Sequence, residues 1–346
     1  MKSNLLTGLL AAVAAILLPL VILGMAPPAL PSDTPLESTS APEAPEASPA
    51  ISPAQRTIQE FVVHRSRPAE EADTPVDSIF HDSDLTVSVL TDGAETKMSL
   101  HDYLTGVLMG EVPASYEPEA LKAQAVAART YTLHRLSHGG TLSDDPAVCQ
   151  AFLPLSSAPE KLGGDWEALL DKLHDAVSET DGLVLTYEGQ LISATYFSGS
   201  GGRTESAQAV WGNAIPYLVS VESPGEEDTT DYESTVTVPL SEFLTRLDIS
   251  SPAVSSVSYT TGGGVDTIVI GGASFTGLEL RKAFGLRSTR FDLAVTEDTV
   301  VFDVLGNGHR VGMSQSGAEA MALAGKTYAE ILSWYYTGVT LEPYVQ

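Results

Sequence analysis

The stretch YLTGVLMGEVPASYEPEALKAQAVAARTYTLHRL, Tyr103–Leu136, contains two helical patterns that meet at a corner. Around its start, apolar residues recur at i, i+3, i+4, i+7 and i+8, the spacing of one helix face. These residues are Leu100, Tyr103, Leu104, Val107 and Leu108. Pro113 interrupts the pattern, and Ser115 is a candidate cap for a second helix with Pro118 in its first turn. The second helix is rich in alanine, so we expect neighbouring elements to approach its backbone closely.

A single acid, Glu111, lies at this corner beside the apolar end of the first helix. A position of this kind favours a raised carboxyl pKa, because burial disfavours the charged form. The plainer interpretation of the pattern alone is a solvated glutamate at a helix end. Polar Lys122, Gln124 and Arg129 stand among the alanines of the second helix and are candidate substrate-binding residues.

The stretch resembles the signature of the stage II sporulation protein D (SpoIID) family. Members typically read Y-L-x-G-V-x-x-x-E-(M/V)-P-A-S-(F/Y)-x-x-E-A-L-K-A-Q-A-V-A-A-R-T-Y, and nearly every fixed position is present between Tyr103 and Tyr131. Two later stretches resemble the same family in the same order, so the resemblance covers about residues 80 to 345. In that family the glutamate of the E-x-P-A-S segment is the catalytic acid of a peptidoglycan lytic transglycosylase. The resemblance assigns this role to Glu111.

The second stretch, ATYFSGSGGRTESAQAVWGNAIPYLVSVESPGEE, begins at Ala194 and resembles the family's F-x-S-T-S-G-G-x-T-E-x-S-E-x-V-W-G. Its glycines permit close approach of a ligand or of another backbone, and its hydroxyls and backbone amides suit a sugar groove. The candidate substrate-binding residues are Ser198, Ser200, Thr204 and Glu205. Tyr196, Trp211 and Tyr217 offer faces for sugar rings, although aromatic residues at such positions are often part of the core.

The third stretch, Gly306–Tyr344, resembles the family's G-x-G-H-G-V-G-M-S-Q-x-G-A segment and its closing helix. Within it His309, Ser314 and Gln315 lie in a glycine-bounded loop that opens a helix, where they are candidate groove residues. Arg310 replaces a residue that is usually glycine in relatives. It either alters a loop that needs a positive φ or adds a cation to the groove.

A loop between these stretches, SHGGTLSDDPAVCQAF, follows Leu136. In some SpoIID-like proteins the corresponding loop holds zinc through one histidine and two cysteines, and His138 and Cys149 match the first and last of these. Asp144 or Asp145 lies near the place of the missing cysteine, and zinc accepts carboxylate ligands. The resemblance therefore suggests that this loop can bind zinc, although the implied reaction requires no cofactor. The alternative is a small buried cysteine and a surface histidine.

Composition narrows the classes of partner. The formal net charge of -27 disfavours nucleic acid, whose binding proteins need a basic surface. It also disfavours electrostatic docking on anionic headgroups, whereas a neutral glycan remains compatible. Cys149 is the single cysteine, so an internal disulfide is excluded.

The chain divides into three parts. Residues 1–26 have one basic side chain followed by an apolar run whose length suits a bilayer span, which predicts an uncleaved signal anchor in the cell membrane with the rest of the chain outside. Residues 27–77, rich in Pro, Ala, Ser and Glu, are typical of a disordered linker, with one weak apolar patch at Ile58–His64. Residues 78–346 are the expected catalytic domain.

Alternating strand and helix patterns predict an α+β domain with mixed, mostly antiparallel strands and a substrate groove. Strands are expected at 85–90, 183–187, 191–197, 234–238, 254–260, 265–270, 291–295 and 299–304. Further helices are expected at 165–177, 241–247 and 276–284, and an acidic, solvated loop at 225–233.

The implied reaction is nonhydrolytic cleavage of the β-1,4 bond between N-acetylmuramic acid and N-acetylglucosamine, on glycan strands stripped of stem peptides. Members of the family act with a cell-wall amidase and a membrane protein during engulfment of the forespore, so the resemblance implies such partners. Two alternatives remain open. One is a two-carboxylate glycoside hydrolase that pairs Glu205 with Glu111, and the other is a non-catalytic, glycan-binding amidase enhancer.

Overall fold

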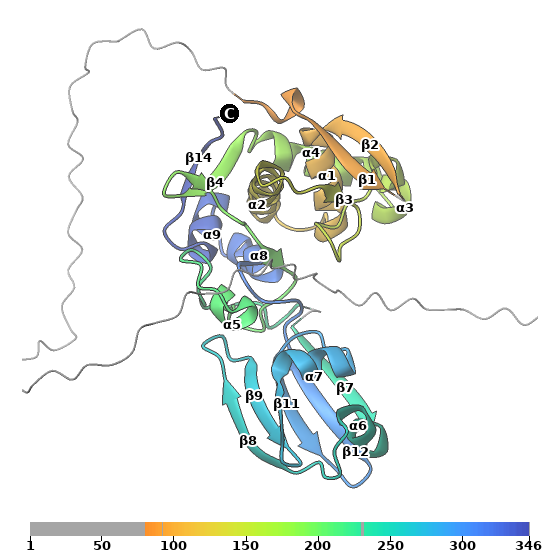
Figure 1. Ribbon diagram of the computed structural model, residues 1–346. Helices are drawn as coiled ribbons and strands as arrows, with labels where there is room; N and C mark the ends of the chain where they lie inside the picture. The colour runs from red at the N-terminus through yellow and green to blue at the C-terminus, as the bar shows by residue number, and fades with distance from the viewer. Residues whose placement is uncertain (1–79, 92, 230–231, 346) are drawn as a thin grey trace, which may run out of the picture. The chain divides into compact units, whose positions relative to one another are not determined.

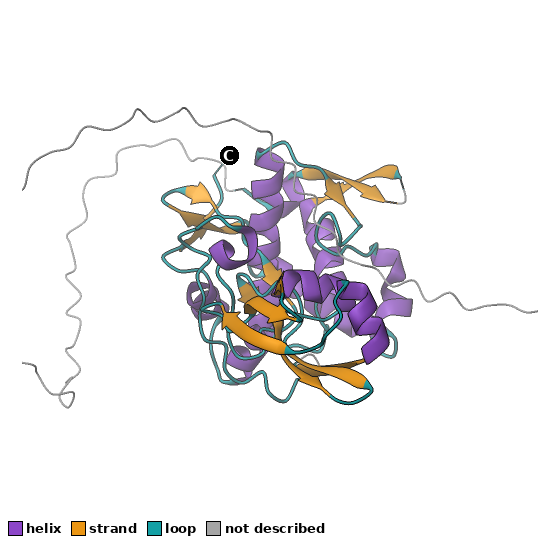
Figure 2. Ribbon diagram, turned by 60° about the horizontal axis from the view of Figure 1, so that its bottom comes forward, coloured by secondary structure: helices purple, strands orange, loops and turns teal. Residues whose placement is uncertain are grey.

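The computed structural model describes residues 80–91, 93–229 and 232–345. These residues form several short sheets between helices (Figures 1 and 2), so the predicted α+β class is confirmed. The anchor at 1–26 and the expected linker at 27–77, with the apolar patch within it, lie outside the described residues. None of the described helices is both long and apolar enough to cross a membrane.

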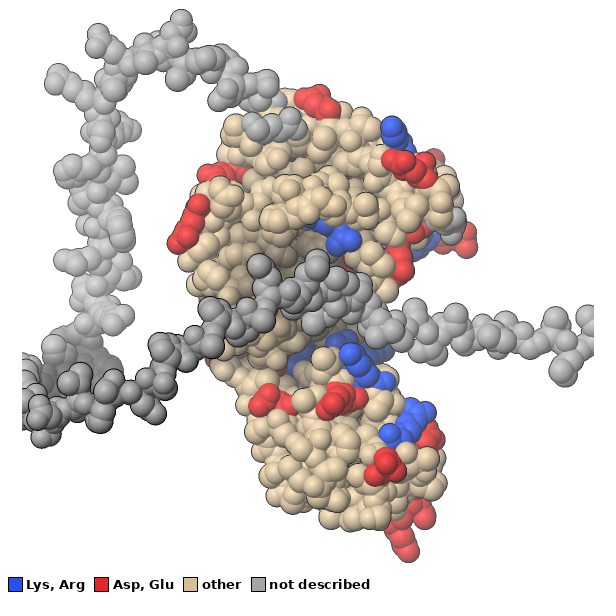
Figure 3. Space-filling view, in the orientation of Figure 1, with Lys and Arg blue, Asp and Glu red and all other residues tan. Residues whose placement is uncertain are grey.

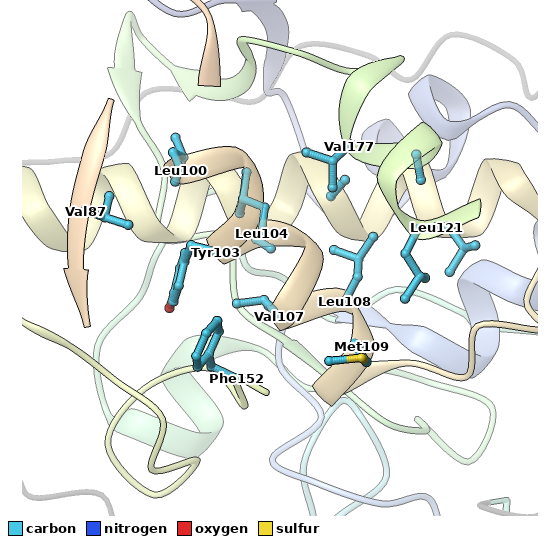
Figure 4. Close-up of a cluster of buried hydrophobic side chains, with 14 of the residues drawn as sticks. Val87, Leu100, Tyr103, Leu104, Val107, Leu108, Met109, Leu121, Phe152 and Val177 are labelled. Atoms are coloured by element: carbon cyan, nitrogen blue, oxygen red, sulfur yellow. The ribbon is translucent and has the colours of Figure 1, made fainter. Parts of the chain in front are cut away.

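The two helices of the signature stretch form the centre of the first hydrophobic core. The helices of this region are α1 (Leu100–Glu111), α2 (Pro118–Ser137), α3 (Ala158–Leu162) and α4 (Trp166–Ser178). The apolar stripe predicted for α1 is fully buried (Figure 4). It packs with side chains of α2, α4 and strand β1 (Thr86–Thr91). The predicted corner between two helices is therefore confirmed.

The start of α2 differs from the prediction. Its N-cap is Glu117, which makes no side-chain cap bond, and Pro118 is the first helical residue, so Ser115 is not the cap. Instead, the Glu117 N–H donates to a carboxylate oxygen of Glu319 at 2.7 Å, and Glu119 accepts from the Tyr328 N–H at 2.7 Å. Glu319 lies on α8 (Gln315–Leu323), and Tyr328 is the first residue of α9 (Tyr328–Tyr335). These two helices therefore hold the beginning of α2 in place.

Arg129 holds the middle of α2 in place. Its guanidinium is fully buried and donates from Nε and Nη2 to both carboxylate oxygens of Asp82, at 2.8 and 2.6 Å. Further bonds reach the carbonyls of Val177 and Leu183. Asp82 lies in the short 3-10 turn η1 (Asp82–Asp84), so one ion pair joins the start of the domain to α2 and α4.

The strands that flank these helices are short. Strand β1 (Thr86–Thr91) pairs antiparallel with β2 (Ala94–Ser99) and parallel with β3 (Leu142–Ser143). Strand β4 (Leu183–Tyr187) lies between β14 (Thr340–Pro343) and β5 (Gln190–Leu191), and α2 packs against it. The 85–90 prediction is confirmed within a residue at each end. Strand β2 was missed because its sequence, AETKMS, is mostly exposed and shows no apolar alternation.

The predicted strand at 191–197 is wrong as one element. A tight turn, in which the Thr195 N–H donates to the Ser193 carbonyl, separates β5 from β6 (Tyr196–Phe197). Strand β6 then pairs parallel with β13 (Met313–Ser314), which directly precedes α8. This parallel pair brings the second and third signature stretches together.

The remaining strands surround a second core of phenylalanines. One sheet contains β7 (Glu233–Pro239), β12 (Thr299–Leu305) and β11 (Arg290–Val295), and another contains β8 (Val254–Tyr259), β9 (Val265–Ile270) and β10 (Ala273–Thr276). Helices α6 (Leu240–Leu247) and α7 (Gly277–Phe284) pack with them, and Phe243, Phe284 and Phe302 stack together. The predicted hairpins and both helices are confirmed. The last elements are α5 (Ala207–Trp211) and the 3-10 turn η2 (Leu155–Ser157).

The ion pair between Asp82 and Arg129 gives a stability prediction. We expect Asp82→Ala to lower the free energy of unfolding by about 3–5 kcal/mol, because it leaves a buried guanidinium without its counter-charge. Urea unfolding measures this, with Asp84→Ala, an exposed acid of the same turn, as the matched control. The double variant Asp82→Ala/Arg129→Met is expected to recover part of the loss. Equal stability of the two single variants would contradict this role for the pair.

Candidate active site

A cavity of about 290 Å³ opens beside the corner between α1 and α2. Its lining comes from segments far apart in the sequence and includes Glu111, Tyr196, Trp211, Arg281, His309 and Gln315. The end of α1, strand β6, the second half of α7, the start of α8 and the 146–151 loop therefore meet at one place. The predicted catalytic acid lies in the wall of a cavity.

Two glycines of α1 allow the 151–153 segment to reach Glu111. A Cβ at Gly106 would lie 2.5 Å from the Leu153 carbonyl oxygen, and one at Gly110 would lie 3.0 Å from that of Ala151. Because both positions are glycine, the segment lies directly against α1, and the Leu153 N–H donates to the Gly106 carbonyl. This packing places the Ala151 N–H 2.6 Å from Oε1 of Glu111.

The carboxyl of Glu111 accepts from two donors. Besides Ala151, the Gln315 amide donates to Oε2 at 3.4 Å. The Tyr196 hydroxyl lies close enough to lower the pKa of Glu111. Burial raises the pKa of Glu111 above its ordinary value of 4.5, and these donors offset only part of that effect because they favour the carboxylate. The site thus holds an acid that keeps its proton to higher pH than a solvated glutamate, beside groups that stabilise its conjugate base.

Tyr196 is held in place by hydrogen bonds that run through Gln150 to α2. Its hydroxyl donates to the Gln150 side-chain oxygen at 2.7 Å, and the Gln150 amide donates to Thr132 on α2 at 2.9 Å. Burial and the nearby Glu111 raise the pKa of Tyr196 well above its ordinary value, so this hydroxyl remains a donor. The relay ties the orientation of the ring to α2.

His309 forms part of the opposite wall. Its ring lies between Phe197 and Trp211, at centroid distances of 5.7 and 5.5 Å, and its Nδ1 accepts from the Val311 N–H at 3.1 Å. Burial, with a smaller contribution from the charge of Arg281, lowers the pKa of His309 to about 4. The imidazole is therefore neutral near pH 7, and its contacts suit a wall of the groove better than a proton-transfer role.

The structure brings four of the predicted catalytic and substrate-binding residues to the cavity: Glu111, Ser198, His309 and Gln315. Ser314 instead caps α8, accepting from the Gly317 N–H. On α2, Lys122 pairs with Glu119 and Glu179, and Arg129 pairs with Asp82. Gln124 is buried, and its amide atoms have no partner among the described residues. None of these α2 side chains lines the cavity, because they face the core or neighbouring elements.

The hydroxyls of Ser200 and Thr204 are also turned inward. Both the backbone N–H and the hydroxyl of Ser200 donate to the carboxylate of Glu226. Glu226 is fully buried and also accepts from the Ser223 hydroxyl. Thr204 bonds to the backbone of Val221. The expectation of a wholly solvated loop at 225–233 is therefore wrong for Glu226, since this acid is the centre of a buried network.

Glu205 and Arg310 form a buried pair away from the cavity lining. Oε1 of Glu205 accepts from the Thr260 hydroxyl at 2.6 Å and the Gly264 N–H at 3.0 Å, and Arg310 Nη1 lies 3.5 Å away. Arg310 adopts a φ of 66° and is fully buried, with its guanidinium also on the carbonyls of Ser200 and Gly262. It thus keeps the positive φ that glycine would adopt, and it is not a cation of the groove.

The two residues proposed as zinc ligands, His138 and Cys149, lie in different surroundings. Nowhere in residues 80–91, 93–229 and 232–345 do three or more His, Cys, Asp or Glu side chains gather so that they could hold a metal ion. His138 Nδ1 lies 2.7 Å from the His134 carbonyl, and the two imidazoles stack. Cys149 lines the cavity near the Tyr103 hydroxyl. The two residues singled out as zinc ligands therefore have other contacts.

Sequence reasoning missed several lining residues, among them Tyr131, Gln150, Arg281 and Asn307. Tyr131 ends the signature and Asn307 stands two residues before His309, so their positions beside the matched motifs were a usable signal. Gln150 and Arg281 carry no such signal. The first lies in a loop and the second near the end of α7, and only tertiary packing brings them to the cavity that Glu111 lines.

The raised pKa of Glu111 gives a prediction about stability and pH. The folded protein binds a proton more tightly than the unfolded chain, so the wild type loses free energy of unfolding as pH rises from about 4.5 through the folded pKa. Glu111→Gln removes this loss. We expect the variant to gain stability relative to the wild type across that window, measured by urea unfolding at a series of pH values. A difference that does not change with pH would contradict the raised pKa.

Comparison with known proteins finds relatives of this chain. The sequence profile of the SpoIID family, described as "Stage II sporulation protein", matches residues 93–187. Stage II sporulation protein D of Bacillus subtilis (strain 168) is 39% identical over 253 residues, covering 70% of this chain and 74% of the relative. The protein of the same name from Bacillus amyloliquefaciens is 38% identical over 253 residues, with the same coverage. The "Amidase enhancer" of Bacillus subtilis is 32% identical over 307 residues, covering 70% of this chain but 40% of that protein. The chain belongs to the stage II sporulation protein D family.

Proposed function

We propose that this protein is a peptidoglycan lytic transglycosylase whose single catalytic carboxyl is Glu111. One observation carries the proposal: of the described residues that line the cavity, Glu111 alone is a carboxylic acid. Hydrolysis by a glycosidase ordinarily needs two carboxyl groups on opposite sides of the scissile bond. A lone acid fits a reaction in which the sugar itself supplies the nucleophile.

The proposed reaction uses the proton of Glu111 twice. The neutral carboxyl donates its proton to the oxygen of the β-1,4 bond between N-acetylmuramic acid and N-acetylglucosamine. The resulting carboxylate then accepts a proton from the C6 hydroxyl of the muramic residue, whose oxygen attacks the anomeric carbon and closes a 1,6-anhydro ring. The raised pKa supports the first step, since more of the acid is protonated near neutral pH.

The groups around Glu111 support the second step. The N–H of Ala151 and the amide of Gln315 donate to the two carboxylate oxygens, so the anion formed by the first step is stabilised without a fixed counter-charge. Trp211 and Tyr196, which line the same cavity, offer apolar surface against which a sugar ring packs.

A non-catalytic, amidase-enhancing role is the second candidate, because one relative carries the name "Amidase enhancer". The two-carboxylate hydrolase has less support. Glu205 is 1% exposed and accepts hydrogen bonds from Thr260 and Gly264, so it has no access to a water molecule in the cavity.

The proposed setting is the outside of the cell membrane during sporulation. Relatives carry the name "Stage II sporulation protein D", and the apolar run within residues 1–26 would anchor the chain. The proposed substrate is glycan stripped of stem peptides, made by a partner amidase of the engulfment machinery.

Glu111→Gln tests the mechanism directly. It keeps the shape of the side chain but has no proton to donate, so we expect 1,6-anhydro products to fall by at least about 100-fold, in line with the loss of a general acid. Mass spectrometry of digested peptide-free glycan strands gives the readout. Glu167→Gln, an exposed acid of α4, is the matched control and is expected to retain activity.

The products distinguish the three functions. Anhydro ends from the wild type and none from Glu111→Gln support the proposal, whereas reducing ends would indicate a hydrolase. If neither protein cleaves the strands but the wild type increases cleavage by an amidase, the enhancer role holds.

Gln315 gives a second test through the pH profile. Its amide stabilises the carboxylate, so Gln315→Leu is expected to raise the pKa of Glu111 further and to move the alkaline limb of kcat/KM to higher pH. Gln208→Leu, on the exposed side of α5, is the control. A shift of that limb to lower pH would contradict the assigned hydrogen bond.

A further inference from the structure

Arg281 is a cation in the wall of the cavity that holds Glu111. It lies near the end of α7, and its Nε donates to the Leu286 carbonyl at 3.2 Å. No carboxylate among the described residues lies within ion-pair distance of its guanidinium, in contrast to Arg129 and Arg310, which pair with buried acids. The Nη groups of Arg281 therefore have donors left for a ligand.

The surroundings of Arg281 do not neutralise its charge. Arg281 is the one Lys or Arg among the described residues that line the cavity, and Glu111, whose pKa is raised by burial, is the one acid there. His309 is neutral near pH 7. The chain as a whole has a formal net charge of -27, yet several Lys and Arg side chains gather near the middle of the face in Figure 3. A partly buried cation without a counter-charge costs stability, which points to an anionic group on the ligand.

The shape of the guanidinium narrows the ligand class. Arginine binds a carboxylate through two parallel N–H···O bonds, and such charged bonds are stronger than neutral ones. A peptide-free muramic acid presents one carboxylate, that of its lactyl ether. When a stem peptide is attached, that group is an amide, which is neutral and offers one carbonyl oxygen. We infer that Arg281 binds the lactyl carboxylate of peptide-free muramic acid and thereby selects strands from which the peptides have been removed.

This inference rests on the proposed function for the nature of the substrate, and it adds the residue that distinguishes stripped from unstripped strands. Arg281 is on α7, whereas the catalytic acid is on α1. The residue that selects the strand and the residue that transfers the proton thus lie on separate helices that line one cavity.

The test compares two forms of the same glycan strand in the full-length protein. One has free lactyl carboxylates, and in the other they are capped as methylamides. We expect the wild type to show a higher kcat/KM on the free strand, and Arg281→Gln to lose about 10- to 100-fold on that strand, which brings it close to the capped one. Lys282→Gln, the exposed neighbour on the same helix, is the matched control and is expected to keep the preference.

Arg281→Lys covers the case in which the glutamine variant does not fold. It keeps the charge but not the two-pronged geometry, so we expect an intermediate preference for the free strand. Raising the salt concentration is expected to weaken binding of the free strand in the wild type and to leave the capped strand largely unaffected. Equal losses on both strands in the Arg281 variants, or an unchanged preference, would overturn the inference.

Binding separates this inference from the proposed catalysis. Calorimetry with Glu111→Gln protein measures affinity for free and capped oligosaccharides without cleavage. Tighter binding of the free form, abolished in Glu111→Gln/Arg281→Gln, supports the role of Arg281 even if the wild type cleaves neither strand. Absence of any difference between the two forms overturns it, even if the wild type cleaves both.

Discussion

The site depends on keeping one carboxyl group away from water while leaving it open to a cavity. Glu111 meets this condition because two glycines of α1 admit the 151–153 segment, whose Ala151 N–H reaches one carboxylate oxygen. Gln315 approaches the other oxygen from α8, and Tyr196 comes from the parallel pair of β6 and β13. Desolvation and hydrogen bonding act on the pKa in opposite directions. Their balance is set by three segments that no local pattern connects.

The helices of the signature were predictable because an apolar stripe of helical period leaves few alternatives. The roles of its polar residues were not. Lys122, Gln124 and Arg129 share a motif with Glu111, yet Arg129 is an internal ion-pair partner. Lys122 pairs with Glu119 of the same helix and with Glu179 at the end of α4. Within one sequence, a polar residue that stabilises the fold has the same appearance as one that faces a ligand. The burial of each side chain in the structure distinguishes the two kinds.

The residues that the sequence left unassigned are those whose partners are distant. Arg310 looked like either a strained replacement or a groove cation, and it is instead a buried link between the loop that follows β6 and the turn between β8 and β9. Glu226 looked solvated because its neighbours are acidic and polar, but it closes a network with Ser200. Both outcomes depend on tertiary contacts, which override local composition.

The hydrogen bonds at the corner join residues about 200 positions apart: Glu117 with Glu319, Glu119 with Tyr328, and Glu111 with Gln315. Contacts of such sequence separation form late, because the intervening chain must first be ordered. A polypeptide still being made, or one cut short before α8, lacks the groups that close the corner. In such an incomplete chain Glu111 lacks its Gln315 donor and β6 lacks its β13 partner, so the surroundings of this acid are complete only when synthesis is nearly finished.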